Sequence, residues 1–107
     1  MIHTIKDAEA LIFFLKKTGF PEVKLIGSFA KGETESIHDI DILLEGYKLN
    51  PSLEDQLIYL LEPQPCERAD GTFADKGITY TDWGGLYLHN TFFGNIDIFF
   101  SIEDFDY

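Results

Sequence analysis

Two acids, Asp39 and Asp41, stand two residues apart in the otherwise apolar stretch DIDILL at residues 39–44. Side chains two apart on a strand point to the same face, so a strand here would place the two carboxylates side by side. Adjacent carboxylates repel each other and raise each other's pKa unless a cation joins them. Mg²⁺ suits such oxygens, because it typically takes one or two carboxylates together with substrate phosphates. The pair therefore predicts a divalent-cation site, and two solvated acids at a strand edge are the plainer alternative.

A glycine and a serine, Gly27 and Ser28, precede the acids and follow a short apolar run. A glycine lets the backbone approach a phosphate closely. The serine adds a hydroxyl at the start of a short helical turn, where exposed amides can bind an anion. A strand, a Gly-Ser turn and paired acids together predict a site for a metal-chelated triphosphate.

Two other familiar motifs fail in the same segment. Residues 27–34 fit G-x-x-x-x-G-x-T, but Glu33 occupies the position where a phosphate-binding P-loop needs its lysine. The acids also begin like a calcium loop, but Leu43 and Leu44 fall where the third oxygen ligand and the invariant glycine belong. Neither a P-loop nor a calcium loop is therefore expected.

These residues resemble the signature of the nucleotidyltransferases of the polymerase-β superfamily, most closely the minimal, single-domain members. That signature is Gly-Ser-x-Ala-Arg-Gly, a short variable run, and then Ser-Asp-x-Asp on a strand. This chain has GSFAKG at 27–32 and HDID at 38–41, with the same interval, and the resemblance is strong over residues 22–46. Lys31 replaces the usual arginine, which keeps the charge but loses bidentate phosphate geometry, and His38 replaces the usual serine.

The family also has a third carboxylate on a later strand beside the first two. The best match is Asp97, in a weaker segment of resemblance at 94–101. Ile96, Ile98 and Phe100 form one apolar face of this expected strand and leave Asp97 on the other. The other late acids fall at a turn or in the C-terminal tail. An outward-facing acid on an edge strand is the alternative.

The resemblance implies a two-metal transfer of a nucleoside monophosphate from an NTP, with ATP as the expected donor, to an acceptor hydroxyl. Asp39 and Asp41 would hold both Mg²⁺ ions, and Asp97 would complete the site of the ion that activates the acceptor. Such ions stabilise the attacking and leaving oxygens of an in-line displacement. Gly27 and Ser28 would cradle the β- and γ-phosphates. Lys31 would add charge there, although a surface-facing helix lysine fits its position equally well.

The acceptor is less defined, because we expect a chain of 107 residues to lack the extra domain with which larger relatives hold theirs. It would be brought by another chain, or it would be very small. Minimal relatives are often paired with a helical HEPN-type toxin, which they neutralise by binding or by nucleotidylating it. The alternative function is therefore an antitoxin-type binding module with weak or no catalysis. A cationic small molecule, as in aminoglycoside modification, is a third expectation for the acceptor.

The elements that must position these residues follow from periodicity and turn chemistry. Helices are predicted over 4–18, with apolar residues at helical spacing, and after Asn50-Pro51, where Ser52 would be the cap. Strands are predicted at 22–26, 39–44, 78–82, 85–89 and 95–101, and an irregular loop at 63–77. The expected fold is one α+β domain over 1–107: a mixed sheet of about five strands with two main helices packed on one face, the nucleotidyltransferase arrangement.

Aromatic residues are frequent in the predicted strands of the second half. Tyr80, Trp83 and Tyr87 could form a wall for a nucleobase, but such side chains more often lie in the core of a sheet. We expect at least two of the three to lie in the core. His89 shows no evident partner in the sequence and is expected to be a structural or surface residue.

The composition narrows the set of partners. The net charge is −11, and residues 51–107 carry 11 acidic but only 2 basic side chains. Such a surface repels phosphate backbones, so duplex nucleic acid is not expected, whereas a basic partner protein is. No stretch approaches the length of a membrane span, and the single cysteine cannot form an internal disulfide. A soluble, cytoplasmic protein without a membrane partner is the expectation.

Overall fold

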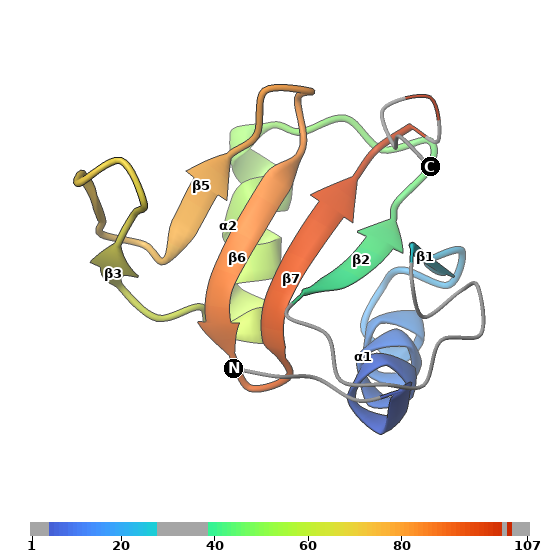
Figure 1. The fold of residues 1–107 in the computed structure, drawn as a ribbon. Helices are drawn as coiled ribbons and strands as arrows, with labels where there is room; N and C mark the ends of the chain where they lie inside the picture. Colours follow the sequence, from blue (N-terminus) through green and yellow to red (C-terminus); the bar gives the residue numbers. More distant parts are fainter. Residues whose placement is uncertain (1–4, 28–38, 102, 104–107) are drawn as a thin grey trace.

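A mixed five-stranded sheet carries both helices on one of its faces in the computed structural model, which describes residues 5–27, 39–101 and 103 (Figure 1). The strand order is β1-β2-β7-β6-β5, and β3 and β4 form a separate two-stranded sheet. The elements are α1 (Ile5–Lys17), β1 (Lys24–Ile26), β2 (Ile40–Leu43), α2 (Pro51–Leu61), β3 (Cys66–Glu67), β4 (Phe73–Ala74), β5 (Ile78–Tyr80), β6 (Leu86–Thr91) and β7 (Gly94–Phe99). The expected α+β arrangement is confirmed.

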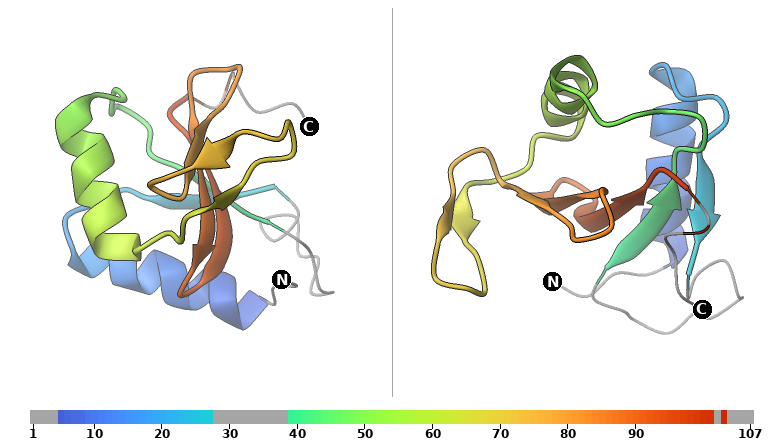
Figure 2. Two further views of the ribbon diagram at one scale, coloured as in Figure 1. Left: turned by 90° about the vertical axis from the view of Figure 1, so that its left-hand side faces the viewer. Right: turned by 90° about the horizontal axis from the view of Figure 1, so that it is seen from above.

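The core lies between the helices and the sheet. Leu11 and Leu15 of α1 and Leu57 and Leu61 of α2 are buried there, in one cluster with apolar side chains of β2, β6 and β7. Figure 2 shows both helices on the same side of the sheet, so no helix of the described residues lies over the opposite face. No helix in the described part of the chain has the length and apolarity needed to cross a membrane.

The central strands β2 and β7 run parallel, and their register decides which side chains meet. Ile40 pairs with Ile96, and Asp41 pairs with Asp97. Because side chains alternate along a strand, the isoleucines enter the core while the two aspartates reach the open face. Strand β6 continues the pattern on the other side of β7, where Tyr87 pairs with Asp97.

The prediction of an irregular loop at 63–77 is wrong in part, because this segment contains the paired strands β3 and β4. One side chain organises this segment: Arg68 Nε donates to Thr79 Oγ1 at 3.1 Å, and its Nη2 donates to the carbonyl of Ile78 at 2.9 Å. Its Nη1 donates to Thr72 Oγ1 and to the carbonyl of Phe73, both at 3.1 Å. The guanidinium therefore joins the small sheet to β5.

Two further predictions are corrected. The N-cap of α2 is Asn50 rather than Ser52, since the Asn50 side chain accepts from the Leu53 amide at 2.9 Å and the helix begins at Pro51. Tyr80 and Trp83 are 58% and 41% exposed, so the prediction that at least two of the three aromatic residues lie in the core is wrong. Tyr80 is the last residue of β5 and Trp83 lies in the turn that follows, and both side chains remain in part exposed to solvent.

Candidate active site

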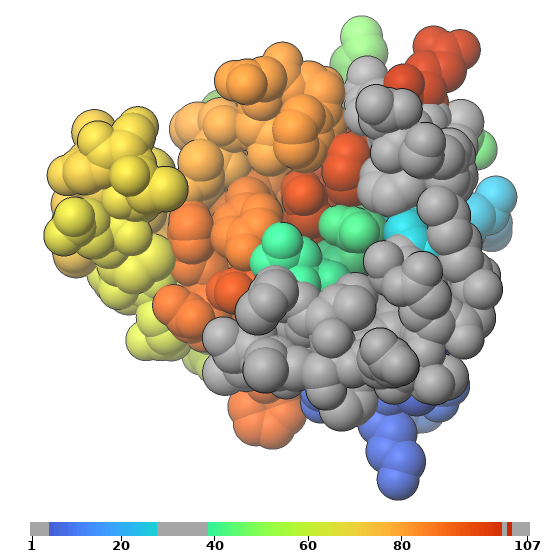
Figure 3. Space-filling model, viewed as in Figure 1, coloured from blue at the N-terminus to red at the C-terminus, as the bar shows by residue number. Residues whose placement is uncertain are grey.

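Three carboxylates gather on the open face of the sheet. Asp41 of β2 lies beside Asp97 of β7 through the parallel register, and Asp39 directly precedes β2. The charge of Asp39 acts on both of the others. In the space-filling view, atoms of β2 and β7 reach the surface at the centre of this face (Figure 3). The three acids predicted from the sequence therefore share one face and interact.

The environment of two of these acids disfavours negative charge. Burial raises the pKa of Asp41 to about 6, and the neighbouring Asp39 adds to the rise. Burial likewise raises the pKa of Asp97 to about 7, with contributions from Asp41 and Asp39. Asp97 Oδ1 is buried and finds no hydrogen-bond partner within the part of the chain that the structure describes. A buried carboxylate oxygen without a donor is costly, so this cluster calls for a proton or a cation.

Gly27 brings backbone directly against the acids. Its φ is +76°, a conformation that favours glycine, and a Cβ built there would collide with the Asp41 carboxylate, lying 3.2 Å from its Cγ. The end of β1 therefore lies directly against the acidic cluster. Ser28, Lys31 and His38, which belong to the same predicted motif, lie outside the described residues.

Tyr87 contacts the acids, a role that the sequence did not predict for it. Its hydroxyl donates to Asp39 Oδ1 at 2.6 Å. Burial, the hydrogen bond to Asp39 and the surrounding acids all raise the pKa of Tyr87 above its ordinary value, so the phenol stays neutral and remains a donor. No local pattern marks this residue, because its partner is 48 positions earlier in the chain.

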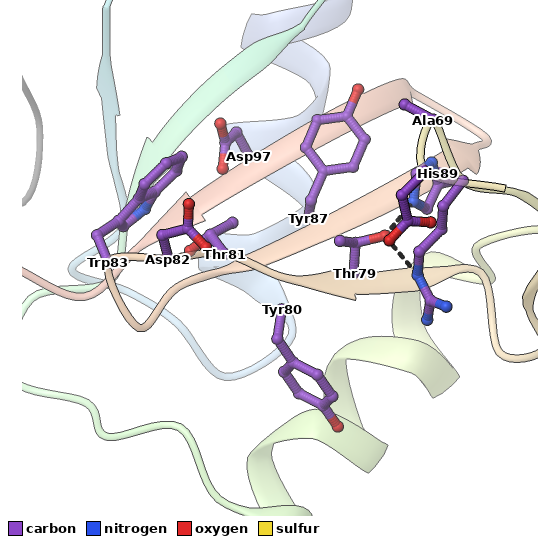
Figure 4. A pocket seen from close by; sticks show the side chains of 11 residues that line it. Ala69, Thr79, Tyr80, Thr81, Asp82, Trp83, Tyr87, His89 and Asp97 are labelled. Carbon is purple, nitrogen blue, oxygen red and sulfur yellow. Dashed lines mark hydrogen bonds between the residues drawn. The ribbon is translucent and has the colours of Figure 1, made fainter. Parts of the chain in front are cut away.

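A pocket of about 380 Å³ lies over β5, β6 and β7 (Figure 4). In the strand order, β1, at whose end Gly27 lies, is at the opposite edge of the sheet from β5. Its lining includes Trp83, Tyr87, His89 and the carboxylate of Asp97. The Trp83 ring stacks on Phe99, with centroids 5.2 Å apart and 6° between the planes. The pocket therefore offers aromatic surfaces beside a carboxylate. Such a combination can hold a small organic molecule.

The end of this pocket away from Trp83 is lined by polar side chains that contact one another. His89 Nε2 lies 2.7 Å from Thr79 Oγ1, and the His89 ring meets Tyr87 edge-on with centroids 4.8 Å apart. Burial, and secondarily the charge of Arg68, lowers the pKa of His89, so the imidazole is neutral at neutral pH. The prediction that His89 lacks a partner is therefore wrong. The sequence could not predict this contact, because Thr79 lies on β5, ten residues before His89 in the chain.

The donors present fit Mg²⁺ in type. All three carboxylates supply hard oxygen ligands, and the unpartnered Asp97 Oδ1 is a ligand atom without a competing bond. Over residues 5–27, 39–101 and 103, no three His, Cys, Asp or Glu side chains are already placed to coordinate one ion. The carboxylates would therefore have to turn toward a shared ion, a rotation about side-chain torsions that leaves the strands in place.

Comparison of the chain with models of protein families, with curated proteins and with solved structures finds no match. The site itself therefore has to indicate the function. Its parts are the paired acids, the glycine that contacts one of them, and the pocket beyond the third acid.

Proposed function

We propose that this protein is a metal-dependent nucleotidyltransferase that transfers a nucleoside monophosphate from an NTP, with ATP as donor, to an acceptor hydroxyl. The observation that carries the proposal is the pairing of Asp41 with Asp97 on the open face, with Asp39 close enough to act on both. The resemblance of residues 27–32 and 38–41 to the minimal members of the polymerase-β superfamily supports it.

The three carboxylates have distinct roles in this proposal. Asp39 and Asp41 would hold the Mg²⁺ ions together, and Asp97 would complete the ligand set on the acceptor side. Bound Mg²⁺ supplies charge stabilisation for the attacking and leaving oxygens of the displacement at the α-phosphorus.

The donor nucleotide would lie on the β1 side of the acids. The Gly27 backbone lies directly against the Asp41 carboxylate, so phosphates held at the end of β1 would lie beside the ligand carboxylates. Ser28 and Lys31 remain the proposed contacts of the β- and γ-phosphates. Pyrophosphate would leave on this side, away from the pocket.

The acceptor would lie on the opposite side of Asp97, in the pocket over β5–β7. Among the described residues that line it are three acids, Asp70, Asp82 and Asp97, and one cation, Arg68. The Arg68 guanidinium is already engaged in four hydrogen bonds. This lining favours a cationic or neutral acceptor over an anionic one. A cationic small molecule and a basic surface of a HEPN-type partner protein both meet that requirement.

Label transfer tests the proposal. The protein is incubated with Mg²⁺, candidate acceptors and ATP labelled on either the α- or the γ-phosphorus, and compared with D97N and the control D55N. Asp55 is an exposed acid on α2, away from the open face. The proposal predicts that wild type and D55N transfer only the α-label, whereas D97N loses transfer by at least about 100-fold.

If wild type transfers no label and shows no thermal shift that depends on Mg-ATP, the proposed nucleotidyltransferase activity is contradicted. Binding of a basic partner with equal affinity by wild type and D97N, without transfer, would instead support the antitoxin-type binding module. The D55N control separates both outcomes from a general effect of removing one negative charge.

A further inference from the structure

Two tyrosines of the β5–β6 hairpin each donate a hydrogen bond of the same length to a carboxylate, but on opposite faces of the sheet. Tyr87 donates to Asp39 Oδ1 and Tyr80 to Glu54 Oε2, both at 2.6 Å. Tyr80 points toward α2, as Figure 4 shows, whereas Tyr87 stands on the open face. Only the bond of Tyr87 therefore involves one of the three acids.

The bond of Tyr87 reaches across a strand. Tyr87 is the register partner of Asp97 in β7, and its acceptor Asp39 precedes β2, which lies on the other side of β7. The phenol therefore ties the segment before β2 to β6 over the position of Asp97. Of all the side-chain hydrogen bonds between described residues, this is the one that reaches the acidic cluster and fixes one oxygen of one carboxylate.

We propose that Tyr87 is a positioning residue that holds Asp39 by one oxygen and thereby sets which divalent cation the acidic cluster accepts. The inference rests on the proposed function, because it requires that the cluster bind a cation. A hydrogen bond at 2.6 Å occupies Asp39 Oδ1, which leaves Oδ2 as the better ligand. Asp39 is thus presented as a ligand that gives an ion one oxygen.

One-oxygen coordination distinguishes ions by size. Mg²⁺ and Mn²⁺ take few protein oxygens in a strict octahedron, whereas Ca²⁺ accepts six to eight oxygens in flexible geometry and often takes both oxygens of a carboxylate. A carboxylate held by its other oxygen therefore suits the smaller ions. Loss of the phenolic hydroxyl would free the second oxygen for Ca²⁺ and remove the orientation that the smaller ions need.

The test compares Y87F with wild type and with the matched control Y80F, which removes the same atom from a bond of the same length on the helix-covered side. Mn²⁺ is titrated without nucleotide and followed by the loss of the electron paramagnetic resonance signal of free Mn²⁺. Mg²⁺ and Ca²⁺ are measured by competition against it. Thermal melting of each variant without metal shows whether the fold is kept.

The expected result is selective. Y87F weakens the binding of Mn²⁺ and Mg²⁺ by about tenfold, as typically follows the loss of a residue that orients a ligand, and changes Ca²⁺ affinity by less than about twofold. The preference for Mn²⁺ over Ca²⁺ therefore falls by about tenfold, while Y80F keeps the wild-type preference. A general loss of structure would weaken all three ions alike and leave the preference unchanged.

Other outcomes overturn the inference in distinguishable ways. Unchanged affinities in Y87F, or equal losses for all three ions, refute the role of Tyr87 and leave the proposed function intact. If wild type binds neither Mn²⁺ nor Mg²⁺, both the inference and the metal site of the proposed function fail.

Discussion

Asp97 is the residue at which burial, neighbouring charge and missing hydrogen bonds coincide. Its Oδ1 is buried without a donor among the described residues, and its pKa is raised to about 7. If this position served only to stabilise the fold, asparagine or a hydrophobic residue would stabilise it more than aspartate does. The local cost therefore points to a function that needs the carboxylate.

The first prediction concerns the stability of D97N. A folded-state pKa of about 7 means that the native protein holds a proton that the unfolded chain, with its pKa of 3.8, releases earlier. The contribution of Asp97 to the stability of metal-free wild type is therefore lost as pH rises from 4 to 7. D97N lacks this titrating group and so lacks this loss. After allowance for solvent screening, we expect D97N to be more stable at pH 8 by about 1 kcal/mol, or about 4 °C in melting temperature.

Melting curves at pH 4 and pH 8, without metal and with millimolar Mg²⁺, check this prediction. The advantage of D97N should largely disappear at pH 4, where Asp97 is protonated in the native state of wild type and about half protonated in the unfolded chain, whose pKa is 3.8. Added Mg²⁺ should stabilise wild type more than D97N. An advantage of equal size at both pH values would show that the charge of Asp97 is not its source.

The second prediction concerns Gly27. G27A combines a positive φ with a Cβ that meets the Asp41 carboxylate, whereas G46A has a φ of +90° with nothing within 4 Å of the added Cβ. We expect G46A to cost about 1 kcal/mol from backbone strain alone and G27A about 2 kcal/mol or more. Urea unfolding measures both. Equal costs would mean that Gly27 does not approach Asp41 closely in solution.

At the scale of single residues, the acids could be predicted and their partners could not. The two-residue spacing of Asp39 and Asp41, and the isolation of Asp97 in an apolar strand, are local signals that survive in the sequence. The contact of Tyr87 with Asp39 depends on two strand registers at once, β6 with β7 and β2 with β7. No single-sequence pattern encodes such a pairing.

At the scale of elements, the third prediction concerns the start of α2. The Asn50 side chain accepts from the Leu53 amide, so N50A should destabilise the protein by about 1 kcal/mol, while S52A should change stability by less than about 0.5 kcal/mol. Chemical unfolding of the two variants decides between the caps. A larger loss in S52A would restore the sequence-based assignment.

The two errors at the scale of elements have separate physical causes. Asn50 and Ser52 are both good caps, and Pro51 between them decides, because proline fits the first turn of a helix and has no amide to satisfy. The two-residue strands β3 and β4 are too short to leave an alternating pattern, and Arg68 holds this segment against β5. The helices and longer strands, whose periodicity spans several residues, were predicted within a few residues of their observed bounds.

At the scale of the whole molecule, charge and architecture act together. The helices cover one face of the sheet, while the open face carries Asp39, Asp41 and Asp97 in a chain of net charge −11. Such a face repels free nucleotide anions and attracts divalent cations. A nucleotide should therefore bind as its metal complex.

The most direct test of this account is calorimetric titration with an ATP analogue whose α,β-bridging oxygen is replaced by methylene, with and without Mg²⁺. The account predicts that wild type and the D55N control bind the analogue only when Mg²⁺ is present. It also predicts that D97N binds at least about tenfold more weakly. Binding that is independent of Mg²⁺, or equal in wild type and D97N, would contradict a metal-nucleotide site formed by Asp39, Asp41 and Asp97.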